Sequence, residues 1–464
     1  MICKSILVAS GPPHYAISQK SPTYRQYRCS PMNRPFLNVT LFLVVSMCCT
    51  PCALAVDVIH ESQLISPGIS NYSLGALAFD GTTLLVSAMN HRSSGGEMVR
   101  VFRLDEERKL VEQPSIPGSS WEQKNFGSAM SISGRFALIG ESGGYNRTGS
   151  VHLYELQTNG WKEVLGSAGS SPYDRMGQSV DLDPHSLIFG MAGKVDNQYG
   201  YNGTGVAYIY STATDWHGDW KATRLQPNGP KFYNFGAAVA VNGSIAVVGA
   251  AGEGRELSRA FIFEQDARGQ WPQTIALSGD FETGHFGSAV DVKGDLVVVG
   301  DPGDYTEGQN WGAAYVFRRQ GPYDWGREAK LTMPLTDGWK DFGYSVSIGD
   351  DGSILICATG YVNDAPESGA AALFTQNDQG VWSQAVTLLP TVPDWDSHFG
   401  HTVAWHNGMA IIAAGTEFPN RTATGAAYAF DLTIPEPTPL ALSVFCAAAF
   451  FTQRTKRSFT RSGV

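Results

Sequence analysis

The sequence predicts an all-β protein: a seven-bladed β-propeller with four-stranded antiparallel blades and a ring closed by the N-terminal strand. Three observations predict it. An apolar residue followed by Gly recurs seven times at intervals of about 50 to 60 residues. Short strand-like runs follow each copy, and the 52 glycines are numerous enough to supply tight turns between them. The last copy lacks a fourth strand, which the segment before the first copy can supply.

A Phe-Gly pair or a close variant opens the first strand of each predicted blade. An alternating run follows, as at 289–292, then a turn and a continuous apolar run such as 296–300. Four turns carry Asp-Gly or Asn-Gly, which favour two-residue hairpins, whereas Asp183-Pro184 must turn differently. The signatures are Leu74-Gly75, Phe126-Gly127, Met176-Gly177, Phe235-Gly236, Phe286-Gly287, Phe342-Gly343 and Phe399-Gly400.

A third strand follows a variable loop in every copy, and most copies open it with small residues, as in Gly312-Ala313-Ala314. We expect these small residues to lie where strands converge near the central channel. The strand ends on an aromatic residue, and a Trp often opens a fourth strand. We expect both aromatics to fill the core between neighbouring blades. The Trp residues are Trp161, Trp220, Trp271, Trp325 and Trp382.

The two ends of the repeat region predict how the ring closes. The last unit stops after Phe430 with three strands, and residues 58–65 form a strand-like run before the first signature. We expect this N-terminal strand to complete the last blade, which removes open sheet edges. Of the seven cysteines only Cys357 lies within the propeller region, residues 56–433, so packing and hydrogen bonds must hold the fold without an internal disulfide.

The N-terminal region carries the features of an export signal. From Met32 the chain has a basic residue, a short apolar run and a small-x-small cleavage site at Ala53 and Ala55. These features predict a secretory signal peptide over residues 32–55. Residues 1–31 are polar and patternless, which indicates an extension that is untranslated, with Met32 as the start, or disordered.

Residues 434–464 contain, in order, Pro435-Glu436-Pro437, an apolar run and a basic cluster. The apolar run is too short to cross a bilayer unaided. This order resembles the PEP-CTERM sorting signal of Gram-negative bacteria that secrete exopolysaccharide. The resemblance implies an exosortase-type processing enzyme as partner and transient membrane association through the tail. It also implies export to the cell surface or extracellular matrix of a Gram-negative-type bacterium. The alternative is a tail that stays in the membrane as an anchor.

The repeats resemble the FG-GAP repeat, the unit of the integrin α-subunit propeller. Two copies carry the likeness most clearly: Phe235-Gly236 with Gly249-Ala250-Ala251, and Phe286-Gly287 with Gly300-Asp301-Pro302. The resemblance covers about residues 56–433. In that family an Asp-rich loop between the first and second strands often binds calcium.

No loop of this sequence has the alternating oxygen donors that wrap a calcium ion. The loop after one second strand carries Asp301, Asp304 and Glu307 without that spacing, so we expect solvated turn residues there. We expect no cofactor, with calcium as the alternative. The sequence also lacks a Cys/His zinc cluster, a nucleophile elbow and a phosphate-binding loop, so we expect no catalytic residues and no metal ligands.

The net charge of −10 argues against nucleic acid as a partner, because phosphate binding needs a basic face. The leading hypothesis is an exported, non-catalytic binding protein that recognises an extracellular glycan or protein through its loops. The alternatives are a carbohydrate-active hydrolase or lyase with paired carboxylates at the channel mouth, and a structural matrix component. Aromatic residues after the second strands favour binding on one exposed face. They are Tyr145, Tyr199, Tyr201, Tyr305, Trp311 and Tyr361.

Overall fold

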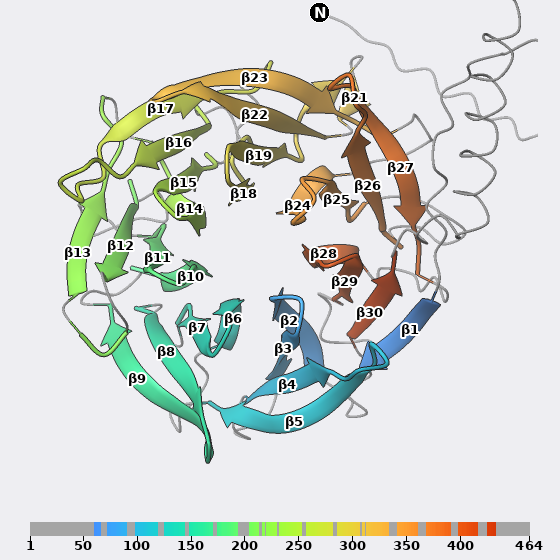
Figure 1. The fold of residues 1–464 in the computed structure, drawn as a ribbon. Helices are drawn as coiled ribbons and strands as arrows, with labels where there is room; N and C mark the ends of the chain where they lie inside the picture. The colour runs from blue at the N-terminus through green and yellow to red at the C-terminus, as the bar shows by residue number, and fades with distance from the viewer. Residues whose placement is uncertain are drawn as a thin grey trace, which may run out of the picture. The chain divides into compact units, whose positions relative to one another are not determined.

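The structure is a computed structural model, and it describes these residues: 60–65, 72–90, 98–118, 125–143, 148–169, 174–193, 204–212, 216–218, 220–229, 232–252, 257–281, 285–306, 309–310, 312–333, 341–360, 368–390, 398–415 and 425–432. Within them the regular elements are β-strands, and none of them forms a helix that could span a membrane. The strands form seven four-stranded antiparallel sheets, the blades of a propeller (Figure 1). The predicted fold class is confirmed.

In each of the first six blades, successive strands lie progressively farther from the central channel (Figure 1). Blade 1 comprises β2 (Tyr72–Phe79), β3 (Thr83–Asn90), β4 (Met98–Leu104) and β5 (Leu110–Pro117). Blade 2 comprises β6 (Phe126–Ser133), β7 (Phe136–Glu141), β8 (Ser150–Gln157) and β9 (Gly160–Ala168). Blade 3 comprises β10 (Met176–Leu182), β11 (Ser186–Met191), β12 (Val206–Thr212) and β13 (Trp220–Leu225).

The next three blades repeat this order. Blade 4 comprises β14 (Phe235–Asn242), β15 (Ile245–Ala250), β16 (Arg259–Glu264) and β17 (Gln273–Leu277). Blade 5 comprises β18 (Ala289–Lys293), β19 (Leu296–Asp301), β22 (Ala313–Gly321) and β23 (Asp324–Leu331), with a small hairpin of β20 (Tyr305–Thr306) and β21 (Gln309–Asn310) after its second strand. Blade 6 comprises β24 (Phe342–Ile348), β25 (Ile354–Ala358), β26 (Ala370–Gln376) and β27 (Trp382–Leu388).

Blade 7 contains strands from both ends of the repeat region. Its inner strands are β28 (Phe399–His406), β29 (Met409–Ala414) and β30 (Ala426–Asp431), and its outermost strand is β1 (His60–Ile65). Strand β1 pairs antiparallel with β30, from His60 opposite Asp431 to Ile65 opposite Ala427. The predicted closure of the ring by the N-terminal strand is therefore confirmed.

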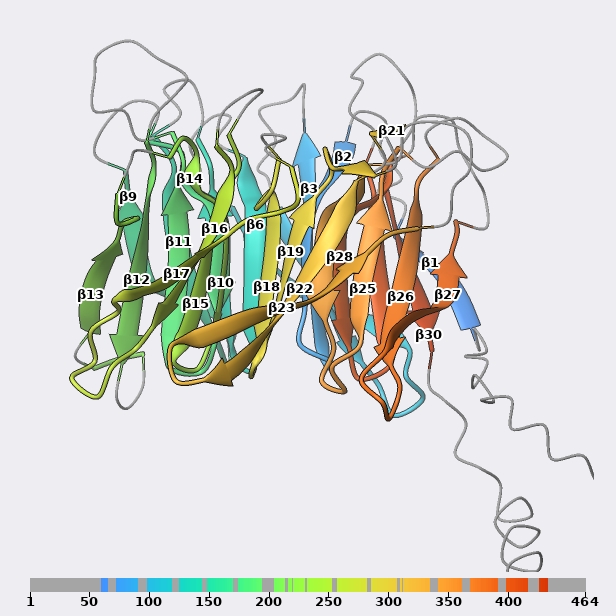
Figure 2. The same cartoon turned by 90° about the horizontal axis from the view of Figure 1, so that it is seen from above.

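The two ends of the ring differ in their connections. We call the end where first strands turn into second strands, as at Asn242-Gly243, the hairpin face. The opposite end, where first strands begin and second strands end, is the loop face, and the β20–β21 hairpin lies there (Figure 2). Because every blade has the same strand order, loops after the second strands all emerge on the loop face.

The turn at Asp183-Pro184 differs from the other hairpins, as predicted. The Asp183 carboxylate accepts the backbone N–H groups of His185 and Ser186 at 2.7 and 2.6 Å. An Asp side chain can close a turn in this way without a residue at positive φ. At Asn407, by contrast, φ is 49°, as a two-residue hairpin of the Asn-Gly kind requires.

The core lies between blades. Phe317 and Trp325 of blade 5 are buried with Val247 and Ile262 of blade 4, so the expected packing of these aromatics between blades is observed. The Phe of the signature joins the same cluster, since the Phe286 and Phe317 rings meet edge to face at 6.5 Å. Each blade therefore buries its faces against its two neighbours and cannot form this core alone.

The small residues that open the third strands do not line the channel, so that expectation was wrong. The first strands line it, and Ala313 and Ala314 instead pack into the cores on the two sides of β22. Gly312 bridges Phe342 of the next blade, and a β-carbon on Gly312 would lie 2.2 Å from the Phe342 carbonyl oxygen. The third strands therefore begin with small residues because they lie close to the next blade, and not because strands converge toward the channel.

Candidate functional site

Among the aromatic residues predicted to bind ligand, Tyr305 lies in the described part of the chain, and its side chain is 51% exposed. It belongs to strand β20 on the loop face (Figure 2). The other predicted residues lie outside the described residues: Tyr145, Tyr199, Tyr201, Trp311 and Tyr361, the sorting motif Pro435, Glu436 and Pro437, and the cleavage residues Ala53 and Ala55.

Two further aromatic residues are exposed on the loop face and were missed from the sequence. Phe281, between β17 and β18, is 47% exposed, and Tyr344 of β24 is also exposed. The Tyr344 ring lies 5.4 Å from the His401 ring, centroid to centroid. Tyr344 could have been found by comparing the residue after each signature, which is Ser, Ala or Gln in most copies. Phe281 has no such signal, since loops after the fourth strands vary.

Lys330 of β23 lies at the centre of a charged and aromatic network beside Phe281 and Tyr305. Its ammonium donates to Asp304 Oδ1 at 2.8 Å and to Asp280 Oδ2 at 3.2 Å. The same nitrogen lies 5.4 Å from the Phe281 ring centroid and 5.3 Å from that of Tyr315. Phe281 and the chain at Tyr305 therefore flank a fixed positive charge.

The buried side chain of Tyr315 supports this network. Its hydroxyl donates to Asp304 Oδ2 at 2.5 Å and accepts the backbone N–H of Asp280 at 2.9 Å. Burial, together with the hydrogen bond to Asp304, strongly raises the pKa of Tyr315, so the phenol stays neutral. Arg327 lies over the Tyr315 ring and forms an ion pair with Asp280. The network thus ties the loop before blade 5 to strands β22 and β23 and to the loop after β19.

The expectation that Asp301 and Asp304 are solvated turn residues was wrong, because both side chains are fully buried. Asp304 accepts from Lys330 and Tyr315, so a lysine ammonium neutralises the carboxylate at this position. The described residues contain no group of three or more His, Cys, Asp or Glu side chains placed to hold a metal ion.

The second candidate region is a cavity of about 620 Å³ in the central channel, toward the hairpin face. The first strands of all seven blades line it. Its ionisable lining residues are Asp80, Asp181, Asp183, Asp291, Lys293 and His406.

Asp181 of β10 connects three blades along this channel. Its carboxylate accepts the Ser131 hydroxyl of blade 2 at 2.8 Å and the Val241 N–H of blade 4 at 2.7 Å. The side chain is surrounded by the inner strands but keeps some exposure to the channel. Burial raises the pKa of Asp181 in spite of these hydrogen bonds.

Asp291 of β18 makes the corresponding contact two blades further on. It accepts the Ile348 N–H of blade 6 and the Val292 N–H, both at 2.7 Å. Burial, with a smaller contribution from the negative charge of Asp181, raises the pKa of Asp291 to about 7. The two carboxyl groups therefore influence each other across the channel and ionise less readily than exposed ones.

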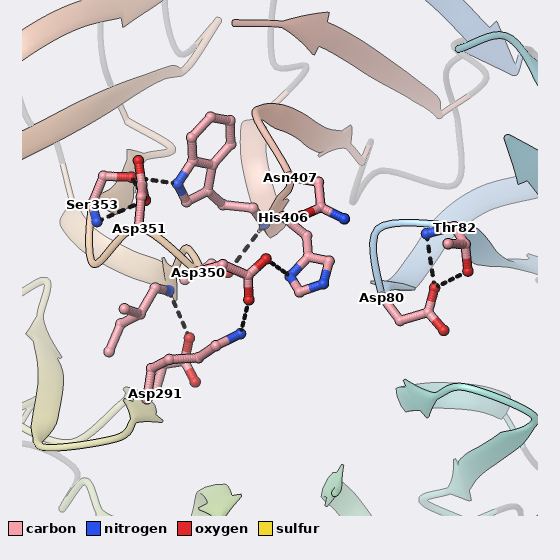
Figure 3. Close-up of polar contacts among 12 residues, drawn as sticks. Asp80, Thr82, Asp291, Asp350, Asp351, Ser353, His406 and Asn407 are labelled. Carbon is pink, nitrogen blue, oxygen red and sulfur yellow. Dashed lines mark hydrogen bonds and ion pairs between the residues drawn. The ribbon is translucent and has the colours of Figure 1, made fainter. Parts of the chain in front are cut away.

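The rim of the cavity is held by an ion-pair chain across blades 5, 6 and 7 (Figure 3). The Lys293 ammonium lies 2.5 Å from Asp350 Oδ1, and His406 Nδ1 lies 2.9 Å from Asp350 Oδ2. Burial lowers the pKa of His406. Burial alone would raise the pKa of Asp350, but Lys293 and His406 together lower it. Lys293 and His406 thus have an acidic partner at the rim.

The remaining rim contacts stabilise the turns. Asp80 Oδ1 accepts the Thr82 N–H at 2.9 Å and its hydroxyl at 2.8 Å (Figure 3). In blade 6, Ser353 donates to Asp351 and accepts the Trp405 indole N–H at 2.7 Å. These hydrogen bonds stabilise the turns at the channel mouth, and the donors named here are already used in them.

Comparison with known proteins identifies the repeat. The family model described as the FG-GAP repeat matches residues 273–317, from β17 to β22. Among solved structures, the chain is similar to the β-propeller domain of the Trilobed protease from Pyrococcus furiosus, which is described as having an open velcro topology. The identity is 11% and the TM-score 0.46, over 79% of this chain and 99% of that chain. No curated protein matches the chain.

Proposed function

We propose that this chain is an exported, non-catalytic binding protein that recognises an extracellular glycan or protein at the loop face of blades 4 to 6. The observation that carries the proposal is the pair of half-exposed aromatics, Phe281 and Tyr305, beside the Lys330 network. Exposed aromatic side chains on a rigid support are typical of binding surfaces, because little side-chain freedom is lost on binding. Export rests on the signal-like features of residues 32–55, and the tail implies an exosortase-type partner.

The geometry of the network supports binding more than chemistry. Asp280, Asp304, Arg327 and Lys330 neutralise one another, so each charged group already has a partner. A catalytic acid or base would have to exchange protons freely, whereas these groups hold Phe281 and the β20–β21 hairpin in place. Arg327 and Asp280 retain partial exposure and can donate to and accept from a polar ligand.

The experiment is an array of glycans and extracellular-matrix proteins, probed with the purified full-length chain with and without calcium. We expect saturable binding that Phe281→Ala and Tyr305→Ala each weaken at least about fivefold. Tyr323→Ala is the matched control, because Tyr323 is 53% exposed on a turn at the hairpin face. Binding that persists in both loop-face variants, or that is lost in the control, would contradict the proposal. If binding is lost when calcium is removed, the proposed binding also requires a cation.

A hydrolase or lyase is the second candidate, and one observation favours it. Asp181 and Asp291 face the channel with a raised pKa, a property of carboxyl groups that act as general acids. Mass spectrometry of the array glycans after incubation distinguishes the candidates. Shortened glycans that remain intact with Asp181→Asn or Asp291→Asn would favour the enzyme, whereas bound and unaltered glycans favour the binding protein.

A further inference from the structure

The channel cavity lies toward the hairpin face, away from the loop-face aromatics, and needs its own explanation. Its volume of about 620 Å³ falls within the range of about 300 to 1,000 Å³ that is usual for small-molecule sites. Polar groups from several blades converge on it. A cavity of this size takes a compact occupant.

The donors and acceptors of the lining restrict what fits. Asp80 and Asp183 bind the N–H groups of their own turns, and Lys293 and His406 are paired with Asp350. Asp181 and Asp291 each use both carboxyl oxygens toward backbone N–H or hydroxyl donors. A carboxylate oxygen has two lone pairs, so each of these two side chains keeps some acceptor capacity beyond the contacts named here.

The chemistry of Asp181 and Asp291 selects among ligand classes. Asp291, whose pKa burial raises to about 7, donates a hydrogen bond in its protonated form and accepts in its ionised form. A hydroxyl group also donates and accepts, whereas an ammonium only donates and a phosphate mainly accepts. The ammonium of Lys293 is already paired with Asp350, so the lining offers little attraction to a negatively charged molecule.

We propose that the hairpin end of the channel binds a monosaccharide-sized polyol without negative charge, held by hydrogen bonds to Asp181 and Asp291. The ring of first strands supplies a rigid wall, and the two carboxyl groups, from blades 3 and 5, contact hydroxyls on different sides of the molecule. This site is separate from the loop-face surface and does not depend on it.

The test is saturation-transfer NMR with the full-length chain and D-glucose, D-galactose or D-mannose as probes, with D-glucuronate as the acidic probe of the same size. We expect saturable binding of at least one neutral sugar and at least tenfold weaker binding of D-glucuronate. Asp291→Ala should weaken the neutral sugar at least tenfold, and Asp291→Asn should weaken it less, because the amide still donates and accepts. The matched control is Asp295→Ala, a change at an exposed residue on the turn that follows β18, outside the cavity lining.

The proposal is overturned by the following results, measured on variants that remain folded by circular dichroism. They are no saturable binding of any neutral probe, equal binding of D-glucuronate, and unchanged binding in Asp291→Ala. Phe281→Ala separates this proposal from the loop-face one, since it should leave the channel site unchanged. A ligand lost equally in the Asn and Ala variants would point to a cation and also refute the polyol.

Discussion

Gly300 of blade 5 lies directly against Gly343 of blade 6: a β-carbon on Gly300 would be 2.0 Å from the Gly343 carbonyl oxygen. Gly343 belongs to the Phe-Gly signature, and Gly300 to the Gly-Asp-Pro triplet of the preceding copy. The same contact joins Gly249 to Gly287 one blade earlier, also at 2.0 Å. The two halves of the repeat motif therefore meet between blades, where backbone packs on backbone.

Gly300→Ala should lower the free energy of unfolding by about 2 to 4 kcal/mol, because neither backbone can yield without moving a blade. Gly321→Ala is the control, since nothing lies within 4 Å of a β-carbon there. It should change stability by less than about 0.5 kcal/mol. Urea unfolding followed by tryptophan fluorescence gives both values, and equal values would refute the contact.

Removal of Lys330 should be costly because Asp304 is fully buried. Lys330→Met leaves that carboxylate without its positive partner, and we expect a loss of about 3 to 5 kcal/mol in unfolding free energy. The double variant with Lys330→Met and Asp304→Asn should regain part of the lost unfolding free energy. Arg327→Met, at an exposed ion pair, should cost less than about 1 kcal/mol. If Lys330→Met and Arg327→Met lower the unfolding free energy equally, the buried Lys330–Asp304 pair does not stabilise the fold more than the exposed ion pair does.

Asp291 should make stability depend on pH. Its ordinary pKa of 3.8 rises to about 7 in the folded protein, so the folded state keeps a proton that the unfolded state releases between these values. This contribution is fully present below about pH 4 and is lost as the pH rises through about 7. Between pH 5 and pH 8 the unfolding free energy of the wild type should therefore fall by about 1 to 3 kcal/mol more than that of Asp291→Asn. Parallel slopes in the two proteins would show that Asp291 does not titrate in this range.

Strand β1 should be needed for a closed ring. A chain without residues 1–65 leaves β30 as an unpaired edge, and we expect Tm to fall by about 5 to 15 °C. The edge should also cause association at high protein concentration. A chain that begins at Val56 is the control, and calorimetry with light scattering gives both readouts. An unchanged, monomeric protein without β1 would contradict closure by this strand.

Much of the fold was predictable because it rests on local and repeated signals. The Phe286-Gly287 signature, the turn dipeptides and the missing fourth strand of the last unit were sufficient for the blades and their closure. The site was much less predictable. Asp304 lies in the loop after β19 and Lys330 lies on β23, 26 residues away, and spacing along the chain does not reveal that their side chains meet. For the same reason Asp304 was interpreted as a solvated turn residue.

The channel residues were missed for a related reason. Asp181 and Asp291 occupy alternating strands in which a polar residue is expected on the solvent side. Their hydrogen-bond partners come from the adjacent blades 2, 4 and 6, and only the packing of neighbouring blades brings these groups together.

The glycine contacts between blades have a consequence for how such a chain can diverge. Where Gly300 meets Gly343, the spacing of adjacent blades is set by main-chain atoms, whose size does not change with side-chain substitution. Apolar core residues can be exchanged and loop-face connections can lengthen while the angle between blades stays constant. Evolution can thus vary the loop-face connections of one copy without changing the spacing of the other six blades.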